Sequence, residues 1–236
     1  MSKFVASVSF GKDSLAMLLK IIEEGLPLDE VVFYDTGAEF NCIYEIRDKV
    51  VKELLEPKGI KYTELKPKIP FFETMFNKEV KHRDGTISKG YSWCGGPCRW
   101  GTRQKTQAIN KYLKGASVYV GIAYDEPKRI ERAKQKGQLL PLVDYGMTES
   151  DCLKYSYEQG FDWVEGNVRL YDILDRVSCW CCANKNNKEL KAYYRYLPAY
   201  WNKLKEFQQN TDRPFKKGKS IFDIEKKIKE ADNGGK

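Results

Sequence analysis

The chain has 236 residues, of which 42% are hydrophobic and 31% charged, and its formal net charge is +8. This length is sufficient for one sizeable core, and the composition excludes a disordered or fibrous protein. The positive charge favours anionic partners, including nucleotides and nucleic acids, without choosing among them.

The N-terminus resembles neither a signal peptide nor a transit peptide, and no segment approaches the roughly 18 to 20 apolar residues that span a bilayer. We therefore expect a cytoplasmic protein with no membrane partner. In that compartment the seven cysteines stay reduced. Clustered cysteines in a cytosolic chain are more often metal-binding or catalytic than disulfide-bonded.

The first 65 residues alternate between strand and helix patterns. Apolar and β-branched runs predict strands at 4–9, 30–34 and 60–65, and helical spacing predicts helices at 14–24 and 43–55. Such alternation indicates right-handed crossovers between parallel strands. The predicted fold class is α/β, a parallel twisted sheet with helices on both faces.

Residues 66–100 interrupt this alternation with prolines, glycines and the first cysteine pair, and we expect a long functional loop or insertion there. The only histidine, His82, lies in this segment and is interpreted as a loop residue. A helix at 102–113 and a strand at 117–123 are predicted to follow. Residues 1–145 would form a nucleotide-binding core that includes the insertion.

The remaining residues, 146–236, are predicted to form a helical part that completes the cysteine site and ends in a basic tail. The run at 139–145 suggests an edge strand, although its proline argues against a central one. Thr148 is predicted to cap a helix, and another helix is expected over 188–209. The aromatic residues of that helix should pack on the core: Tyr193, Tyr194, Tyr196, Tyr200 and Trp201.

A polar loop follows the first predicted strand and precedes the first helix: Ser9, Phe10, Gly11, Lys12, Asp13 and Ser14. Free amides and the positive end of the dipole make a helix N-terminus a natural anion site. Lys12 would add a positive charge, and Asp13 would cap the helix or help to place Mg²⁺. The spacing is not that of a Walker A loop. Phosphate binding is favoured over a simple capped turn because ligands bind at the carboxyl ends of parallel strands.

Two cysteine pairs, Cys94 with Cys98 and Cys179 with Cys182, supply four thiolates at spacings that let a loop wrap a metal. Tetrahedral sulfur ligation suits both Zn²⁺ and iron–sulfur clusters. Cys181 is a spare thiol, either a catalytic nucleophile or a bystander. The two remaining cysteines, Cys42 and Cys152, are expected to pack as small apolar groups.

The loop at 9–14 resembles the pyrophosphate-binding loop of the adenine nucleotide alpha hydrolase superfamily, with Phe10 in place of the usual first glycine. That replacement, together with "FYDTGAEF" at 33–40, "GIAYDEPKRIERA" at 121–133 and "LLPLVDYGMTESD" at 139–151, resembles the phosphoadenosine phosphosulfate (PAPS) reductase-like branch. The resemblance covers roughly residues 4–185.

The resemblance implies an adenosine nucleotide, ATP or a relative, as ligand. It places Asp35, Thr36 and Gly37 beside the nucleotide or its metal ion and Gly121 near the adenosine. It also implies that Arg129 meets a phosphate or a substrate anion. Lys105 resembles the family's basic residue near a cluster and substrate. In the adenylyl-sulfate reductases that the chain resembles, a cysteine pair and a later CxxC hold a four-iron four-sulfur cluster, so the resemblance slightly favours such a cluster over Zn²⁺. The first pair of those reductases is adjacent, whereas three residues separate Cys94 from Cys98.

The sulfonucleotide reductases use a C-terminal cysteine that has no counterpart here, since no cysteine follows Cys182. The leading hypothesis is therefore an enzyme that cleaves ATP between the α and β phosphates, with Lys12 stabilising the pyrophosphate, and adenylates an unknown acceptor for sulfur transfer. Nucleic acid is one candidate for that acceptor. A sulfur or electron donor protein is a further candidate partner, and the chain is also a candidate for a homo-oligomer. The alternatives are a PAPS or adenylyl-sulfate reductase that uses Cys181 or a cysteine on a partner, and a metal-stapled nucleic-acid-binding module.

Overall fold

A computed structural model of the chain describes residues 3–93 and 98–233. The chain divides into two compact units, which are described separately. Unit 1 comprises Met1–Asp35, Asn41–Lys66 and Lys105–Val164, and unit 2 comprises Thr36–Phe40, Pro67–Gln104 and Glu165–Lys236. Each unit therefore draws on both of the segments, 1–145 and 146–236, that the sequence distinguishes.

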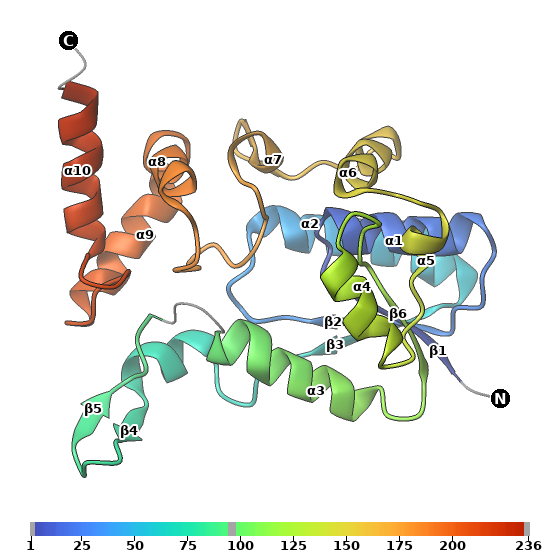
Figure 1. Cartoon of the computed structure of the whole chain (residues 1–236), viewed down its shortest axis with the longest axis horizontal. Coiled ribbons are helices and arrows are strands. Elements are labelled where there is room, and N and C mark those ends of the chain that lie inside the picture. The colour runs from blue at the N-terminus through green and yellow to red at the C-terminus, as the bar shows by residue number, and fades with distance from the viewer. Residues whose placement is uncertain (1–2, 94–97, 234–236) are drawn as a thin grey trace. The chain divides into compact units, whose positions relative to one another are not determined.

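The core of unit 1 is a parallel sheet of four strands in the order β3-β2-β1-β6 (Figure 1). The central strands are β1 (Phe4–Val8) and β2 (Glu30–Tyr34), and the outer ones are β3 (Lys61–Leu65) and β6 (Ser117–Val120). Every residue of β2 is buried, as its nearly continuous apolar sequence requires for a strand covered on both faces. The predicted α/β fold is confirmed.

Helices cover both faces of this sheet, with α1 (Lys12–Glu23) and α3 (Lys105–Tyr112) on opposite sides of it (Figure 1). On the α3 side, Val5 and Val32 pack with Leu113, which directly follows that helix. Most of α1 is buried, including Leu15, Ala16, Met17 and Leu18, all with no exposed surface. Burial of apolar side chains on each face stabilises both layers.

The other helices of unit 1 begin and end at recognisable signals. α2 (Asn41–Val50) continues through a π-helical turn (Val51–Leu55) and a 3-10 turn (Glu56–Lys58) that stops at Gly59, where φ is +65°. α4 (Pro127–Lys134) and α5 (Pro141–Asp144) each start with proline, and α6 (Glu149–Glu158) starts after Thr148. The Thr148 side chain accepts a hydrogen bond from the Asp151 amide, which confirms the predicted cap.

Unit 2 is built from short strands and helices. Its bounds are a π-helical turn (Glu73–Asn77), β4 (Glu79–Lys81), β5 (Ile87–Lys89), a further π-helical turn (Arg99–Gln104), α7 (Leu170–Ile173), α8 (Asn187–Tyr196), α9 (Pro198–Gln209) and α10 (Ile221–Asn233). β4 and β5 form an antiparallel hairpin within the predicted insertion. Where the chain passes from unit 1 into unit 2, the short strand β7 (Val164–Glu165) pairs with β8 (Val168–Arg169).

Aromatic side chains form the interior of unit 2. The Trp180 ring lies 5.4 Å from Phe207 and 5.7 Å from Tyr200, and the Phe72 ring lies 4.7 Å from Phe207. Of the aromatic residues predicted to pack on the core, Tyr193, Tyr200 and Trp201 are buried, whereas Tyr196 is 52% exposed. Edge-to-face and tilted ring contacts of this kind stabilise a small core beyond the area that they bury.

Two secondary-structure predictions were wrong. Leu139 makes only an isolated parallel bridge to Tyr119, and the chain then enters α5 instead of an edge strand, because Pro141 cannot donate a ladder hydrogen bond. The helix predicted over 188–209 is two helices, α8 and α9, separated at Leu197 because Pro198 cannot continue the hydrogen-bond ladder of α8.

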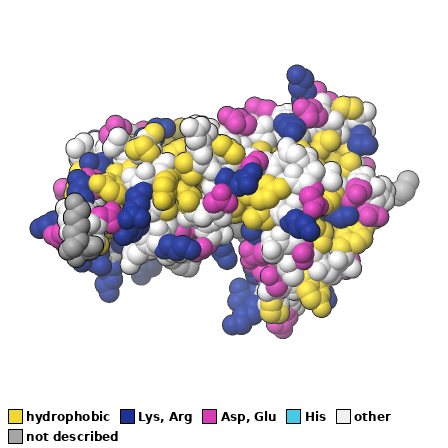
Figure 2. Space-filling view, turned by 90° about the horizontal axis from the view of Figure 1, so that it is seen from above, with side chains coloured by type: hydrophobic (Ala, Val, Ile, Leu, Met, Phe, Trp, Pro, Cys, Tyr) yellow, Lys and Arg dark blue, Asp and Glu magenta, His cyan; other side chains and the backbone are white. Residues whose placement is uncertain are grey.

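Within residues 3–93 and 98–233, none of the helices has the length and hydropathy required to cross a bilayer. Figure 2 shows positive, negative and apolar side chains interspersed over the face that it presents.

Candidate functional site

The loop at 9–14 joins β1 to α1, as the sequence predicts, and one of its residues has an unusual backbone. Phe10 has a φ of +57°, and its side chain is fully buried, with its ring 5.2 Å from that of Phe33. A non-glycine residue in this region is strained by roughly 1 kcal/mol or more. The buried ring therefore fixes a conformation that glycine would adopt without strain.

The loop leads into the N-terminus of α1, and the N-cap residue of that helix, Gly11, supplies no side-chain cap. The Ser14 hydroxyl instead turns back to the loop, where it accepts from the Ser9 amide at 3.1 Å and lies 3.0 Å from the Ser9 hydroxyl. First-turn amides and the positive end of the dipole thus favour an anion at this position.

Lys12 holds its charge inside this site. Its Nζ donates to Asp13 Oδ1 at 2.8 Å and to Glu149 Oε2 at 2.6 Å, and its side chain is only 10% exposed. Burial alone would lower the pKa of Lys12, but the two carboxylates outweigh burial and raise it. Burial raises the pKa of Asp13, while Lys12 opposes that shift. Lys12 therefore stays positively charged beside the first turn of α1.

Gly121 has an observable steric role at the end of β6. A Cβ atom at this position would lie 2.7 Å from the Ser14 Cα and 2.9 Å from the Asp13 carbonyl oxygen. Only glycine allows β6 to approach the first turn of α1 so closely. Arg129 on α4 is exposed, and its guanidinium lies 2.6 Å from the Glu126 carboxylate. The nucleotide contacts assigned to Gly121 and Arg129 remain predictions.

The three residues after β2 divide between the units. Asp35 is buried in unit 1, where Tyr44 donates to it at 2.7 Å and Lys66 lies 3.8 Å away. Thr36, in unit 2, donates to Glu39 at 2.9 Å. Gly37 has a φ of +74° and follows Thr36 in the turn. Asp35 is thus a buried, hydrogen-bonded carboxylate at a strand end, and its predicted role beside a nucleotide or metal remains a prediction.

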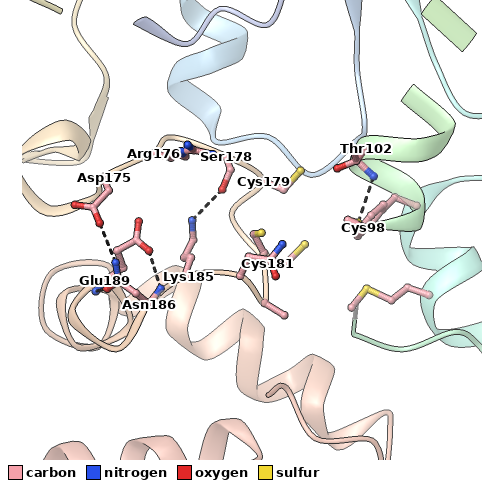
Figure 3. Close-up of a pocket in the computed structure, with 16 residues that line it drawn as sticks. Cys98, Thr102, Asp175, Arg176, Ser178, Cys179, Cys181, Lys185, Asn186 and Glu189 are labelled. Carbon is pink, nitrogen blue, oxygen red and sulfur yellow. Dashed lines mark hydrogen bonds between the residues drawn. The ribbon is translucent and has the colours of Figure 1, made fainter. Parts of the chain in front are cut away.

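Four cysteines lie around a cavity of about 460 Å³ in unit 2 (Figure 3). Cys98, Cys179, Cys181 and Cys182 all line it. A Cβ atom on Gly101 would lie 3.7 Å from Cys179 Sγ and 3.9 Å from Cys98 Sγ. Thiols from segments about 80 residues apart in the sequence thus approach one point, as a shared metal site requires.

The metal site itself remains a prediction. Cys94 lies outside the described residues. Among residues 3–93 and 98–233, no group of three or more His, Cys, Asp and Glu side chains is arranged to hold a metal ion. The donor chemistry of the three described thiols, Cys98, Cys179 and Cys182, nevertheless suits zinc or an iron–sulfur cluster.

Local hydrogen bonds shape the second cysteine segment. The Cys182 amide donates to the Cys179 carbonyl at 3.0 Å, which closes a tight turn. The Trp180 amide donates to the Ala38 carbonyl at 2.9 Å, and the Trp180 ring enters the aromatic core. At the end of the turn, Asn186 and Glu189 cap α8 reciprocally. The turn is therefore anchored on both sides.

The remaining candidate residues differ in exposure. Cys181 is 3% exposed, and burial raises the pKa of its thiol well above the usual range. Cys42 and Cys152 are buried, as predicted, and burial raises the pKa of Cys152 to about 12. Lys105 is the first residue of α3, where its predicted role near a substrate remains a prediction. His82 contacts Ser88 across the β4–β5 hairpin at 2.8 Å.

Sequence reasoning missed three residues near these sites. Glu149 pairs with Lys12 from a distance of 137 positions in the chain. Trp163 donates from its indole to the Phe10 carbonyl at 2.8 Å. Lys185 is 3% exposed, lines the cysteine cavity, and donates weakly to Ser178 at 3.4 Å (Figure 3). Two of them carried a sequence signal: Glu149 lies in the segment 139–151 that resembles the family, and Lys185 lies three residues after Cys182.

Two known proteins, a curated relative and a solved structure, illustrate the low similarity of this chain to its matches. The uncharacterized protein MJ0066 of Methanocaldococcus jannaschii is 28% identical over 217 residues, which cover 84% of this chain and 40% of that protein. The chain thus spans less than half of that relative. The solved structure of the U34-tRNA thiolase NcsA from Methanococcus maripaludis, with its [4Fe-4S] cluster, has a TM-score of 0.43 and 14% identity over 88% of this chain and 72% of that one. That similarity is too low to transfer a substrate or cofactor.

A match to a protein family covers more than half of the chain, residues 3–138, and includes the loop at 9–14, Asp35, Gly121 and Arg129. The matching family is the phosphoadenosine phosphosulfate reductase domain. The chain belongs to this family, and so to the PAPS reductase-like branch of the adenine nucleotide alpha hydrolase superfamily, whose members bind adenosine nucleotides.

Proposed function

We propose that this protein cleaves ATP between the α and β phosphates and adenylates an acceptor, which then receives sulfur. The observation that carries the proposal is the turn at 9–14, where an uncapped helix N-terminus and the buried cation of Lys12 occupy the carboxyl end of a parallel sheet. Family membership supports an adenosine nucleotide as the ligand.

In the proposed reaction an acceptor oxygen attacks the α-phosphorus, and the bond between that phosphorus and the bridging oxygen breaks. Pyrophosphate leaves with the bonding electron pair, so negative charge grows on its oxygens. The first-turn amides of α1 and the Lys12 ammonium stabilise that charge. A sulfur nucleophile then attacks the activated carbon of the acceptor, and AMP leaves.

Two inorganic groups fit this proposal. Mg²⁺ bound to the phosphates would neutralise charge during the cleavage, with Asp13 as the carboxylate of the loop. The thiolates of Cys94, Cys98, Cys179 and Cys182 would hold a four-iron four-sulfur cluster or Zn²⁺, and such a group would bind and polarise the incoming sulfur. Cys98, Cys179 and Cys182 line one cavity, which supports a shared ligand.

ATP/pyrophosphate exchange by anaerobically purified protein, with candidate acceptors present, tests the proposal. Lys12→Ala should reduce exchange roughly 100-fold, the usual effect of removing a group that stabilises transition-state charge. Lys20→Ala is the matched control, since Lys20 lies on the same helix but pairs with Glu23 at the surface. Absence of exchange with every acceptor, or equal exchange in Lys12→Ala, would contradict the proposal.

The distribution of charge favours nucleic acid as the acceptor class. Unit 2 has 23 Lys and Arg residues against 14 Asp and Glu, whereas unit 1 has 18 against 19. The whole positive excess of the chain is therefore in the unit that carries the five clustered cysteines. Binding of tRNA or DNA that weakens steeply with salt and persists in Lys12→Ala would support this acceptor class. Binding that does not depend on salt would count against it.

Reduction of PAPS or adenylyl sulfate by Cys181 is less well supported. A nucleophilic thiol must be accessible and ionised. Cys181 is buried, and its pKa is raised. Release of sulfite from either nucleotide in the presence of thioredoxin, lost in Cys181→Ser, would restore that alternative.

A further inference from the structure

We propose that Trp163 is a positioning residue for the phosphate-binding loop, because it turns the Gly11 amide toward the anion. This inference rests on the proposed function of that loop. Trp163 lies beyond the residues that match the family, in the segment between α6 and β7. Its indole Nε1–H donates to the Phe10 carbonyl at 2.8 Å, and both side chains have no exposed surface.

The geometry of one peptide unit connects this hydrogen bond to the ligand. The described chain has no cis peptide bond, so the Phe10 carbonyl and the Gly11 N–H point in opposite directions across a planar trans peptide. Trp163 binds the carbonyl from the buried side. The Gly11 N–H, which is the N-cap amide of α1, is consequently directed away from the core.

The backbone of Phe10 makes such an anchor necessary. Its φ of +57° is an unfavourable conformation for an aromatic residue, and the peptide that follows it would relax in the absence of restraint. Phe33 restrains the side chain through an edge-to-face contact, while Trp163 restrains the carbonyl. A glycine at this position would have no buried ring, and the peptide after it could rotate more freely. With Phe10, the hydrogen bond from Trp163 holds that peptide in one orientation, so the Gly11 N–H keeps one direction.

Buried hydrogen bonds to charged groups are stronger than neutral ones, and misdirecting one donor weakens anion binding about 10-fold or more. Trp163→Phe keeps the buried ring but removes the donor. We expect ATP and inorganic pyrophosphate to bind about 10-fold more weakly to this variant, as measured by calorimetry. Adenosine, which has no phosphate, should bind with unchanged affinity.

Trp201→Phe is the matched control. Trp201 is also a buried tryptophan, and its indole donates to Glu225 at 2.9 Å in unit 2. That variant should lose stability while its affinity for ATP stays unchanged. If Trp163→Phe binds ATP as wild type does, the positioning role is wrong, although the proposed function stands. If wild-type protein binds neither ATP nor pyrophosphate, the proposed function fails first.

A measurement on the wild-type sequence covers the case in which Trp163→Phe does not fold. Protein labelled with 5-fluorotryptophan gives a separate fluorine resonance for each of its five tryptophans. Addition of pyrophosphate should shift the Trp163 resonance, because the loop anion polarises the peptide that Trp163 binds. The Trp201 resonance should not move. An unchanged Trp163 resonance at a pyrophosphate concentration that saturates the protein would overturn the inference.

Discussion

Lys12 Nζ lies 2.6 Å from Glu149 Oε2, so the first residue of α1 is paired with the first residue of α6. The pair is not a simple surface contact, since the Lys12 side chain is 10% exposed. In the proposed function, a phosphate that binds the loop would have to share Lys12 with Glu149 or displace it, and Glu149 would compete with the nucleotide for that cation.

Replacing Glu149 by Gln should strengthen the binding of nucleotide. The substitution removes a carboxylate that repels phosphate and occupies Lys12, and in the absence of Mg²⁺ we expect ATP to bind roughly 3- to 10-fold more tightly, about the effect of one half-exposed ion pair. Calorimetry in EDTA measures this. Glu158→Gln, on the same helix but paired only at 3.8 Å with Lys154, should not change the affinity. Weaker binding in Glu149→Gln would show that Glu149 helps to bind the ligand.

Gly121→Ala should damage both the fold of unit 1 and its phosphate loop. The added methyl group would lie 2.7 Å from the Ser14 Cα. That Cα is a backbone atom, so it cannot move aside as the end of a flexible side chain would. Overpacking of this kind costs about 1–3 kcal/mol of unfolding free energy. Urea unfolding gives that value, and calorimetry should show weaker ATP binding.

Gly101→Ala is a suitable comparison because its methyl group would make ordinary contacts, 3.7 Å from Cys179 Sγ. The stability of this variant should stay close to that of wild type. An equally stable Gly121→Ala protein would contradict the close approach of β6 to α1.

Stability in acid should depend on Glu30. Burial opposes its charge, but hydrogen bonds from Lys3, Thr63, Tyr112 and Lys61 lower its pKa from 4.5 to about 2. Because the pKa is lower in the folded state, ionised Glu30 stabilises the protein above about pH 4.5, and this stabilisation is lost as the pH falls toward 2.

Urea unfolding at a series of pH values between 7 and 3 measures this dependence. The difference in unfolding free energy between wild type and Glu30→Gln should be largest at neutral pH and should shrink below about pH 4.5. The control, Glu158→Gln, changes an exposed carboxylate and should leave the pH profile unaltered. A Glu30→Gln difference that stays constant across this range would exclude the role assigned to the carboxylate.

The cysteine cavity predicts which thiols hold a metal. Serine substitutions at Cys98, Cys179 and Cys182 should each remove bound iron and acid-labile sulfide from anaerobically purified protein. The same substitution at Cys152, which is fully buried in unit 1, should leave the metal content unchanged. Stoichiometric zinc without acid-labile sulfide would show that the site holds zinc and not a cluster. Retention of metal in all three variants would exclude both a zinc site and a cluster at these thiols.

The sequence predicted the parallel sheet because its signals are local. The buried strand at 30–34 and the helix after the loop at 9–14 follow from hydrophobic periodicity, which reflects which face of an element is covered. The predicted cap at Thr148 was equally local, since its partner Asp151 is three residues away. The boundary between α8 and α9 was missed although Pro198 marks it, because the aromatic periodicity continues across the break.

The sequence by itself thus determined the layer architecture, the loop that meets α1 and the two clusters of cysteines. Only the tertiary structure revealed that Glu149 pairs with Lys12, that Trp163 binds the Phe10 carbonyl, and that Gly121 is needed for contact with Ser14. These relationships join residues more than 100 positions apart. Their partners are selected by the packing of helices onto the sheet, and periodicity within a short window holds no information about that packing.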